Sequence, residues 1–257
     1  MRIGPTEIVD TFAEAFTLRF CRLVVTAHDG HWLDAAAASF CGYGTSVIGC
    51  DAETGIDRRL DPGETPDGRP GAELLAFAFT AESAGKAVAN RTAQCLLTCP
   101  TTSVFDGLPE SPDRVPLGGH VRFFGDGFEK ANVVSGRRYW RIPVMDGEVL
   151  AEETAGVAKG VGGGNFIVQA ASLDAALDAA RRAVTAIAAM PGTITPFPGG
   201  VVRSGSKVGS RYGGLRASTN EAFCPSLVGR VETQLVPDAA CALEVVIDGH
   251  APAAVAA

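Results

Sequence analysis

The chain has 257 residues, 46% of them hydrophobic, and a formal net charge of −7. This length and composition supply enough apolar surface for one large domain or two small ones. The acidic balance disfavours nucleic-acid binding, because neutralising phosphates needs a basic face.

No apolar run is long enough to cross a bilayer, and the first residues lack the apolar stretch of a signal peptide. The seven cysteines are scattered and form no CxxC pair. Reduced thiols in the cytoplasm are therefore expected. His28 and His31 have no third ligand nearby, so no metal site is predicted.

The first part of the chain alternates apolar strand patterns with helical ones. Between His31 and Cys41, apolar residues recur at helical spacing, and Gly42 follows as a helix stop. The expected segments, in chain order, are strand 21–27, helix 31–41, strands 45–50 and 73–79, helix 81–95 and extended chain at 96–99.

The same pattern recurs in the second part. Ser172 is a good N-cap for a helix that ends at Pro191. The expected strands or extended pieces are 165–171, 193–197 and 241–247.

The recurrence predicts an α+β protein made of two βαββαβ units by internal duplication, each an antiparallel sheet with helices on one face. The expected lobes are residues 1–147 and 148–257. The long loops 51–71 and 198–238 take equivalent places in the two units. Loops on a rigid scaffold are where function concentrates.

The segment 196–225 is dense in glycine and serine, with basic residues among them. Glycines let the backbone approach a ligand, and Ser204, Ser206 and Lys207 offer donors to an oxygen-rich molecule. The segment is not a P-loop, because Ser206 separates Gly205 from Lys207. Lys207 is either an anion contact or a solvated lysine.

Three further motifs leave alternatives open. Arg69, in the turn 64–71, either makes a ligand or interface contact or closes a salt bridge within the turn. The run FFGDGF around Asp126 is either a hairpin turn with core phenylalanines or a pocket wall. The run GVGGGN, which ends at Asn165, fails the dinucleotide fingerprint because a strand follows it.

Glu244 lies inside the apolar strand CALEVVI. Alternation along a strand favours a solvent-facing side chain. If the side chain is buried instead, desolvation raises the pKa of its carboxyl group, which suits proton transfer near neutral pH.

In order, the motifs resemble one family, the formylmethanofuran:tetrahydromethanopterin formyltransferases. The matching words are DTFAEAF, GYGTSVIGCDAETGID, ETPDGRPG, CPTTSVFD, FFGDGF, GGGNF, PFPGGVV, SGSKVGS, ASTNEAFCP and LEVVIDG. Together they cover nearly the whole chain.

The resemblance implies two ferredoxin-like lobes, homo-oligomers and a site built with the loops. It implies formyl transfer between the amine of methanofuran, or an analogue, and N5 of tetrahydromethanopterin. Both carriers are substrates, and no tightly bound cofactor or metal is implied. The family's catalytic glutamate corresponds to Glu244, which favours the buried, functional alternative.

Methanofuran carries a carboxylate-rich tail and the pterin a phosphate-bearing one, so polar and aromatic contacts are expected. The substrate-binding candidates are Arg69, Phe124, Asp126, Asn165, Phe197, Ser204, Ser206 and Lys207.

The family continues beyond the LEVVIDG strand, whereas this sequence ends at Ala257, so the second lobe is expected to be C-terminally shortened. That departure keeps an alternative: a non-catalytic subunit that binds carriers or holds a formyltransferase/hydrolase complex together.

Overall fold

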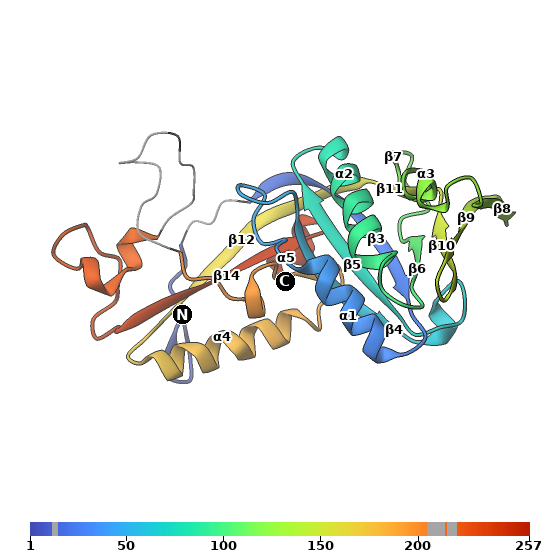
Figure 1. Ribbon diagram of the computed structural model, residues 1–257. Coiled ribbons are helices and arrows are strands. Elements are labelled where there is room, and N and C mark those ends of the chain that lie inside the picture. The colour runs from blue at the N-terminus through green and yellow to red at the C-terminus, as the bar shows by residue number, and fades with distance from the viewer. Residues whose placement is uncertain (12–14, 205–213, 215–219) are drawn as a thin grey trace.

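The computed structural model describes residues 1–11, 15–204, 214 and 220–257. It has a mixed α/β fold dominated by a 10-stranded sheet. Figure 1 shows an elongated molecule, with α1 and α2 covering the strands at one end and α4 beside β12 and β14 at the other. The expectation of a protein that mixes sheet and helix is confirmed at this level.

The strands are β1 Arg2–Ile3, β2 Thr6–Glu7, β3 Phe16–Thr26, β4 Glu53–Leu60, β5 Gly71–Ala78, β6 Ser103–Asp106, β7 Arg114–Pro116, β8 Lys130–Val134, β9 Arg137–Val144, β10 Gly147–Glu152, β11 Thr154–Gly156, β12 Ala158–Ala170, β13 Thr193–Ile194 and β14 Cys241–Gly249. The helices are α1 Gly30–Cys41, α2 Ala81–Arg91, α3 Gly118–Val121, α4 Leu173–Ile187 and α5 Pro252–Ala256. Short helical turns, η1 to η6, connect them; η3 spans Arg122–Gly125.

The first half of the chain runs β3, α1, β4, β5, α2, β6, and its strands lie in the order β4–β5–β3–β6. The side chain of Asp29 accepts hydrogen bonds from the first turn of α1, and Thr80 caps α2 in the same way. Every residue of β5 is buried. The two helices and these strands enclose the main hydrophobic core, which includes Leu23, Phe40 and Leu74.

Strands β8, β9 and β10 extend this sheet beyond β6. The expected lobe boundary at Gly147 falls in the β9–β10 hairpin, where Gly147 pairs with Val144. Since β10 also pairs with β6, the residues that directly follow the boundary belong to the first half of the sheet.

The chain passes from one half of the molecule to the other within β12. Residues 158–162 of this strand pair with β3, and residues 164–170 pair with β14. One extra residue between Val161 and Gly164 shifts the register against β14, which is a β-bulge. A single long strand therefore joins the two halves.

The second half packs α4 on β12 and β14. Ser172 caps α4 by accepting a hydrogen bond from the backbone of Ala175, as the sequence predicts. Ala176 and Ala180 of this helix form a small buried cluster with Leu243. Strand β13 then pairs with the end of β14.

Three expectations of local structure are wrong. Residues 45–50 form turns instead of a strand, and the strand is β4, within the expected loop 51–71. The apolar pattern fails in β4 because three of its polar residues are buried: Glu53, Thr54 and Asp57. Arg22 pairs with Asp57, and backbone groups bind the side chains of the other two. Residues 96–99 are not extended, and the next strand, β6, begins only at Ser103.

Candidate active site around Glu244

Three polar side chains surround the carboxyl group of Glu244. The Asn165 amide donates to Oε1 at 2.6 Å, and the Asn220 amide donates to Oε2 at 2.7 Å. The Ser204 hydroxyl also donates to Oε2, at 3.2 Å, and Asn220 reaches that hydroxyl at 3.3 Å. The carboxyl group is thus held in one orientation by donors that carry no charge.

The backbone explains how these residues meet. Asn165 of β12 pairs with Val246 of β14, two positions from Glu244 and therefore on the same face of the sheet. Val202 pairs with Glu244 through two backbone hydrogen bonds of 2.8 and 2.9 Å, which brings Ser204 to the carboxyl group. Asn220 comes from the far end of the 196–225 segment.

Glu244 is half-buried, between the two alternatives that its sequence left open. Its neighbours Leu243 and Val245 are buried on the opposite face of β14. The side chain of Glu244 therefore faces Ser204 and Asn220 of the 196–225 segment and not the core. A partly covered carboxyl group with fixed donors can accept or deliver a proton to a bound molecule.

Asn165 and Ser204, both predicted from the sequence, thus lie against Glu244. Phe197 is half-buried on the same segment as Ser204, before Val202. Ser206 and Lys207 fall outside the residues that the structure describes. Asn220 lies in the ASTNEAFCP motif, but the sequence did not predict it as a site residue. No periodicity shows that an irregular segment lies close to a strand that is distant in the sequence.

Arg69 lies elsewhere and is engaged within the chain. It pairs with Asp67 at 2.7 Å, and it donates to the Ser103 hydroxyl at 2.8 Å and to the Thr101 carbonyl. It also donates to Thr26, at the end of β3 far from β12. The eleven residues of β3 alone span roughly 33 Å. Within one chain, the structure therefore shows the internal ion pair and no contact with Glu244.

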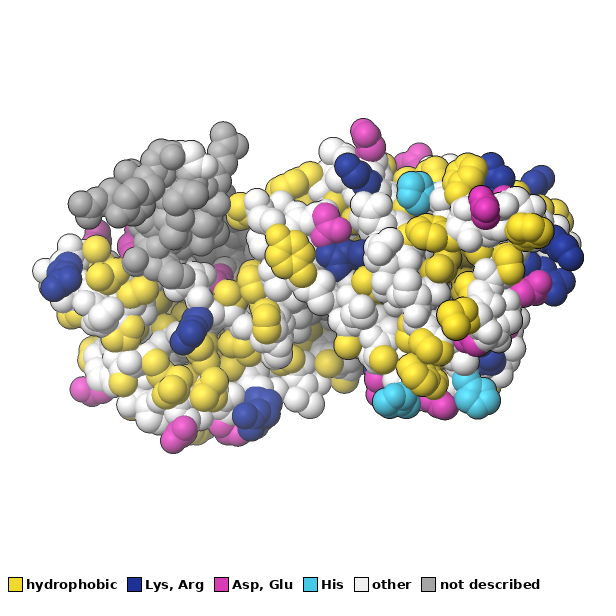
Figure 2. All heavy atoms as spheres, in the orientation of Figure 1, with side chains coloured by type: hydrophobic (Ala, Val, Ile, Leu, Met, Phe, Trp, Pro, Cys, Tyr) yellow, Lys and Arg dark blue, Asp and Glu magenta, His cyan; other side chains and the backbone are white. Residues whose placement is uncertain are grey.

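Phe124 and Asp126 also lie away from Glu244, between α3 and β8 at the opposite end of the molecule (Figure 1). The alternative of core phenylalanines is wrong, because Phe123, Phe124 and Phe128 are 66%, 55% and 77% exposed. Hydrophobic side chains reach the surface at this end, among charged ones (Figure 2). Asp126 adopts a left-handed conformation after a 3-10 turn, so the run is not a hairpin.

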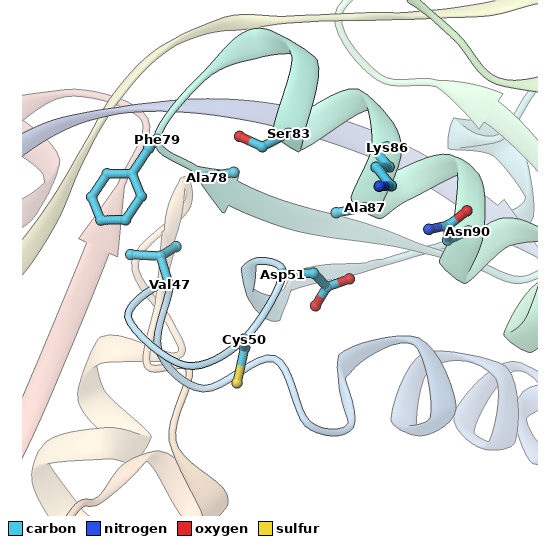
Figure 3. A pocket seen from close by; sticks show the side chains of 9 residues that line it. All are labelled: Val47, Cys50, Asp51, Ala78, Phe79, Ser83, Lys86, Ala87 and Asn90. Carbon is cyan, nitrogen blue, oxygen red and sulfur yellow. The ribbon is translucent and has the colours of Figure 1, made fainter. Parts of the chain in front are cut away.

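A separate pocket of about 350 Å³ lies between α2 and the 42–52 segment. Lys86 and Asn90 of α2 face Asp51 across it, and Phe79 closes one end (Figure 3). The Sγ atom of Cys50 points away from this space (Figure 3). Glu244 is not among the lining residues.

All seven cysteines are free thiols, and burial raises the pKa of Cys21 and of Cys41 to about 12, so neither is a thiolate nucleophile. Within the described residues, no three His, Cys, Asp or Glu side chains gather as a metal-ligand set. In the same residues, no helix is long and apolar enough to cross a membrane.

Two family models together match almost the entire chain. The model described as formylmethanofuran-tetrahydromethanopterin formyltransferase matches residues 1–144, and the model of its proximal lobe matches residues 147–257. The chain belongs to this formyltransferase family. The resemblance inferred from the sequence motifs is thereby confirmed.

Named family members are similar over nearly the full chain. A formylmethanofuran–tetrahydromethanopterin formyltransferase from Methylococcus capsulatus is 51% identical, over 100% of this chain and 86% of its own length. A protein named as a subunit of the formyltransferase/hydrolase complex from Methylorubrum extorquens is 48% identical, over 99% of this chain and 83% of its own length.

Solved structures of the family have the same fold. The formyltransferase from Methanosarcina barkeri superposes with a TM-score of 0.92 at 44% identity, covering 99% of this chain and 86% of that one. A chain of the formyltransferase/hydrolase complex from Methylorubrum extorquens, solved with methylofuran, gives a TM-score of 0.94 at 47% identity, covering 100% of this chain and 85% of that one.

Proposed function

We propose that this chain transfers a formyl group between the amine of methanofuran, or a methanofuran analogue, and N5 of tetrahydromethanopterin, with Glu244 as the proton carrier. Family membership supports the reaction. The observation that carries the site is the half-buried carboxyl group of Glu244, held by Asn165, Asn220 and Ser204.

The reaction needs one acid–base group. The lone pair of N5 attacks the formyl carbon, a C–N5 bond forms, and the carbonyl electrons move to oxygen to give a tetrahedral oxyanion. Glu244 takes the proton from N5. When the oxyanion collapses, the bond to the methanofuran nitrogen breaks, and that nitrogen takes the proton from Glu244.

The neighbours of Glu244 fit this role. Because their donors are uncharged, the carboxyl group can change protonation state without stranding an unpaired cation beside it. Asn165 of β12 holds Oε1 of Glu244, and Asn220 of the 196–225 segment holds Oε2. The carboxyl group therefore keeps one orientation toward a bound carrier when it takes up or releases the proton. In this proposal Phe197 borders the bound carriers, since it precedes Val202 and Ser204 on the same segment.

Arg69, Phe124 and Asp126 have no part in the proposed site of a single chain. The donors of Arg69 are engaged by Asp67, Ser103 and Thr101. We retain Ser206 and Lys207 as proposed contacts to the carrier tails, since they belong to the same segment as Ser204.

We also propose the two-lobed, ferredoxin-like organisation. The βαββαβ order of the first half and its strand order β4–β5–β3–β6 support it, and β12, α4, β13 and β14 repeat the first four elements. A homo-oligomer in the cytoplasm, and assembly into a formyltransferase/hydrolase complex, remain proposals. The similarity to the Methylorubrum extorquens protein, which is named as part of such a complex, supports the latter.

The experiment is a formyl-transfer assay with purified protein, formyl-tetrahydromethanopterin and a methanofuran. Glu244→Gln keeps the size and the hydrogen-bond partners of the side chain but removes its acid–base function. We expect kcat to fall about 10²- to 10⁴-fold, the usual contribution of such a group. Glu232→Gln is the matched control, because Glu232 is an exposed glutamate of the same half.

A Glu244→Gln variant with the full rate would remove Glu244 from the mechanism. If the wild-type chain binds both carriers but transfers nothing, alone and in the complete complex, the alternative of a non-catalytic carrier-binding or scaffolding subunit replaces the proposed reaction.

A further inference from the structure

Two buried carboxyl groups meet where β4 and β14 come together. Glu53 is 5% exposed and Asp248 is 0% exposed. The backbone N–H of Val47 donates to Oε1 of Glu53 at 3.0 Å, and that of Gly163 donates to Oδ1 of Asp248 at 3.2 Å. The other two oxygens, Oε2 and Oδ2, have no donor among the described residues. Asp248 pairs with Ile194, whose side chain lies against Gly55. Gly55 stands two positions after Glu53, so the two carboxyl groups are neighbours.

Two ionised carboxylates offer only acceptors, so such closeness is repulsive unless one carries a proton. A single proton turns the two orphaned oxygens into a donor and an acceptor and satisfies both. Two main causes raise the pKa of Asp248 well above its usual value: burial, which is the larger, and the negative charge of Glu53.

No cation sits against the pair within the described residues. The charged or titratable side chains on β4, β14 and the elements packed around them, besides the pair itself, are Arg19, Cys21, Arg22, His31, Asp34, Cys41, Asp57, Arg58, Arg59, Glu73, Lys159, Asp174, Asp178, Arg181, Arg182, Cys241, Glu244 and His250. The nearby arginines are occupied: Arg22 pairs with Asp57, Arg58 with Glu64 and Glu73, and Arg59 with Asp34. None of these groups is a charge that acts on Asp248; the charge that does so is that of Glu53.

The pair also holds the bulge that re-aims β12. Gly163, which donates to Asp248, has a left-handed φ of +81°, and a Cβ there would lie 2.5 Å from the Phe16 ring. Side chains alternate along a strand, so the extra residue of the bulge decides which face the following residues take. Asn165 follows the bulge and donates to Glu244.

We propose that Glu53 and Asp248 share one proton, and that this acid pair is a positioning device which clamps the β12 bulge and so sets Asn165 against Glu244. The shared proton rests on the burial of the two carboxyl groups, their closeness and their two oxygens without a donor among the described residues. Its consequence for catalysis rests on the proposed function. Neither carboxyl group touches the reacting atoms in this account.

Thermal unfolding against pH tests the shared proton without any assay of activity. In Asp248→Asn the amide supplies the hydrogen bond that the proton supplies in the wild type. The folded wild type keeps a proton that the unfolded chain releases above about pH 4, so its stability falls with rising pH up to the folded pKa of the pair. Between about pH 4 and the folded pKa of the pair, the Tm of Asp248→Asn is therefore expected to rise relative to that of the wild type by about 3 °C per pH unit.

Two further measurements complete this test. Asp174→Asn, at an exposed position of α4, is the control, and its difference in Tm from the wild type is expected to stay constant with pH. An infrared band of a protonated carboxyl group is expected in the wild type at neutral pH and is expected to vanish in Asp248→Asn. A Tm difference between Asp248→Asn and the wild type that is independent of pH would overturn the shared proton.

Steady-state kinetics test the positioning role. Asp248→Asn and Glu53→Gln preserve the hydrogen bonds, and we expect kcat within about 3-fold of the wild type. Asp248→Ala removes the acceptor of Gly163, and we expect kcat to fall roughly 10-fold with KM changed less than about 3-fold, because a displaced Asn165 misdirects Glu244.

The kinetic role is overturned if Asp248→Ala keeps the full kcat, or if Asp248→Asn loses as much as Asp248→Ala. If Asp248→Ala does not fold, the comparison of Asp248→Asn with Glu53→Gln decides, since a large loss of kcat in either folded variant contradicts the positioning role. If the wild type has no transferase activity, the proposed function is wrong. The pH dependence of unfolding still tests whether Glu53 and Asp248 share a proton.

Discussion

The half of the molecule built on β3, β4, β5 and β6 is packed more densely than the half built on β12 and β14. Six of the eleven residues of α2 are buried, against three of the fifteen residues of α4. All of β5 is buried, whereas more than half of the residues of β14 are only half-buried. The first half therefore supplies most of the burial that stabilises the fold.

The carboxylates of the two halves also have different hydrogen-bond partners. In the first half, Glu152 binds Arg137 through two hydrogen bonds of 2.5 and 2.7 Å, and Glu73 lies between Arg22 and Arg58. In the second half, Glu244 has amide and hydroxyl partners instead. A guanidinium partner fixes a negative charge, whereas neutral donors orient a carboxyl group that can still exchange its proton. Apart from the Glu53–Asp248 pair, the scaffold and the chemistry are thus separated between the halves.

The largest expected effect on stability comes from the denser core. Leu74 is 0% exposed in the main cluster, and Leu243 is 9% exposed in the small one. We expect Leu74→Ala to lower the free energy of unfolding by about 4 kcal/mol and Leu243→Ala by about 2 kcal/mol. Urea denaturation measures both, with the exposed Val133→Ala as a control. Equal losses for the two leucines would contradict the difference in packing.

A smaller loss of stability is expected at the carboxylates of the first half. Arg137→Ala leaves the buried Glu152 without its cation and costs about 3 kcal/mol of unfolding free energy, as breaking buried pairs does. Arg141→Ala removes an exposed pair with Glu148 and is expected to cost less than about 1 kcal/mol. The rate of formyl transfer per folded molecule is expected to be unchanged in both. If kcat falls in Arg137→Ala, the two halves are not separate in function.

The smallest free-energy change is expected at the amides of the second half. Asn220→Ala leaves Oε2 of Glu244 with Ser204 alone, and kcat is expected to fall about 10-fold, which corresponds to about 1.4 kcal/mol. The free energy of unfolding should change by less than about 0.5 kcal/mol, because Asn220 lies in an irregular surface segment. Asn132→Ala, at an exposed position of β8, is the matched control. A loss of stability without a loss of rate would make Asn220 a structural residue.

Local sequence patterns predicted the elements that bury one apolar face. Helix α4 begins after Ser172, and α1 ends at Cys41, as spacing and caps indicate. Strand β4 was missed because several of its buried residues are polar; Asp57, for example, is satisfied by Arg22, which is distant in the sequence. The β8 residues are exposed throughout, so that strand has no apolar alternation to reveal it.

The site was predictable only in part, for the same reason. Glu244 and Asn165 stand in expected strands, but the family resemblance, and not the apolar pattern, singled out Glu244, whereas Ser204 stood out in a segment rich in donors. Asn220 reaches Glu244 from an irregular segment, and no spacing rule connects the two. Arg69 looked like a ligand contact because an arginine between glycine and proline is unusual, yet its partners lie on neighbouring segments of the same fold.

The long strand β12 also bears on how the protein is made. Its first residues cover the edge of β3 at Phe16–Phe20, so that edge stays open until residue 162 has left the ribosome. A growing chain therefore presents this open edge of β3 while more than half of the protein is being synthesised, at about 5–20 residues per second. Such an edge is a template for pairing with another chain. Slow completion of β12 is therefore expected to favour aggregation of newly made copies.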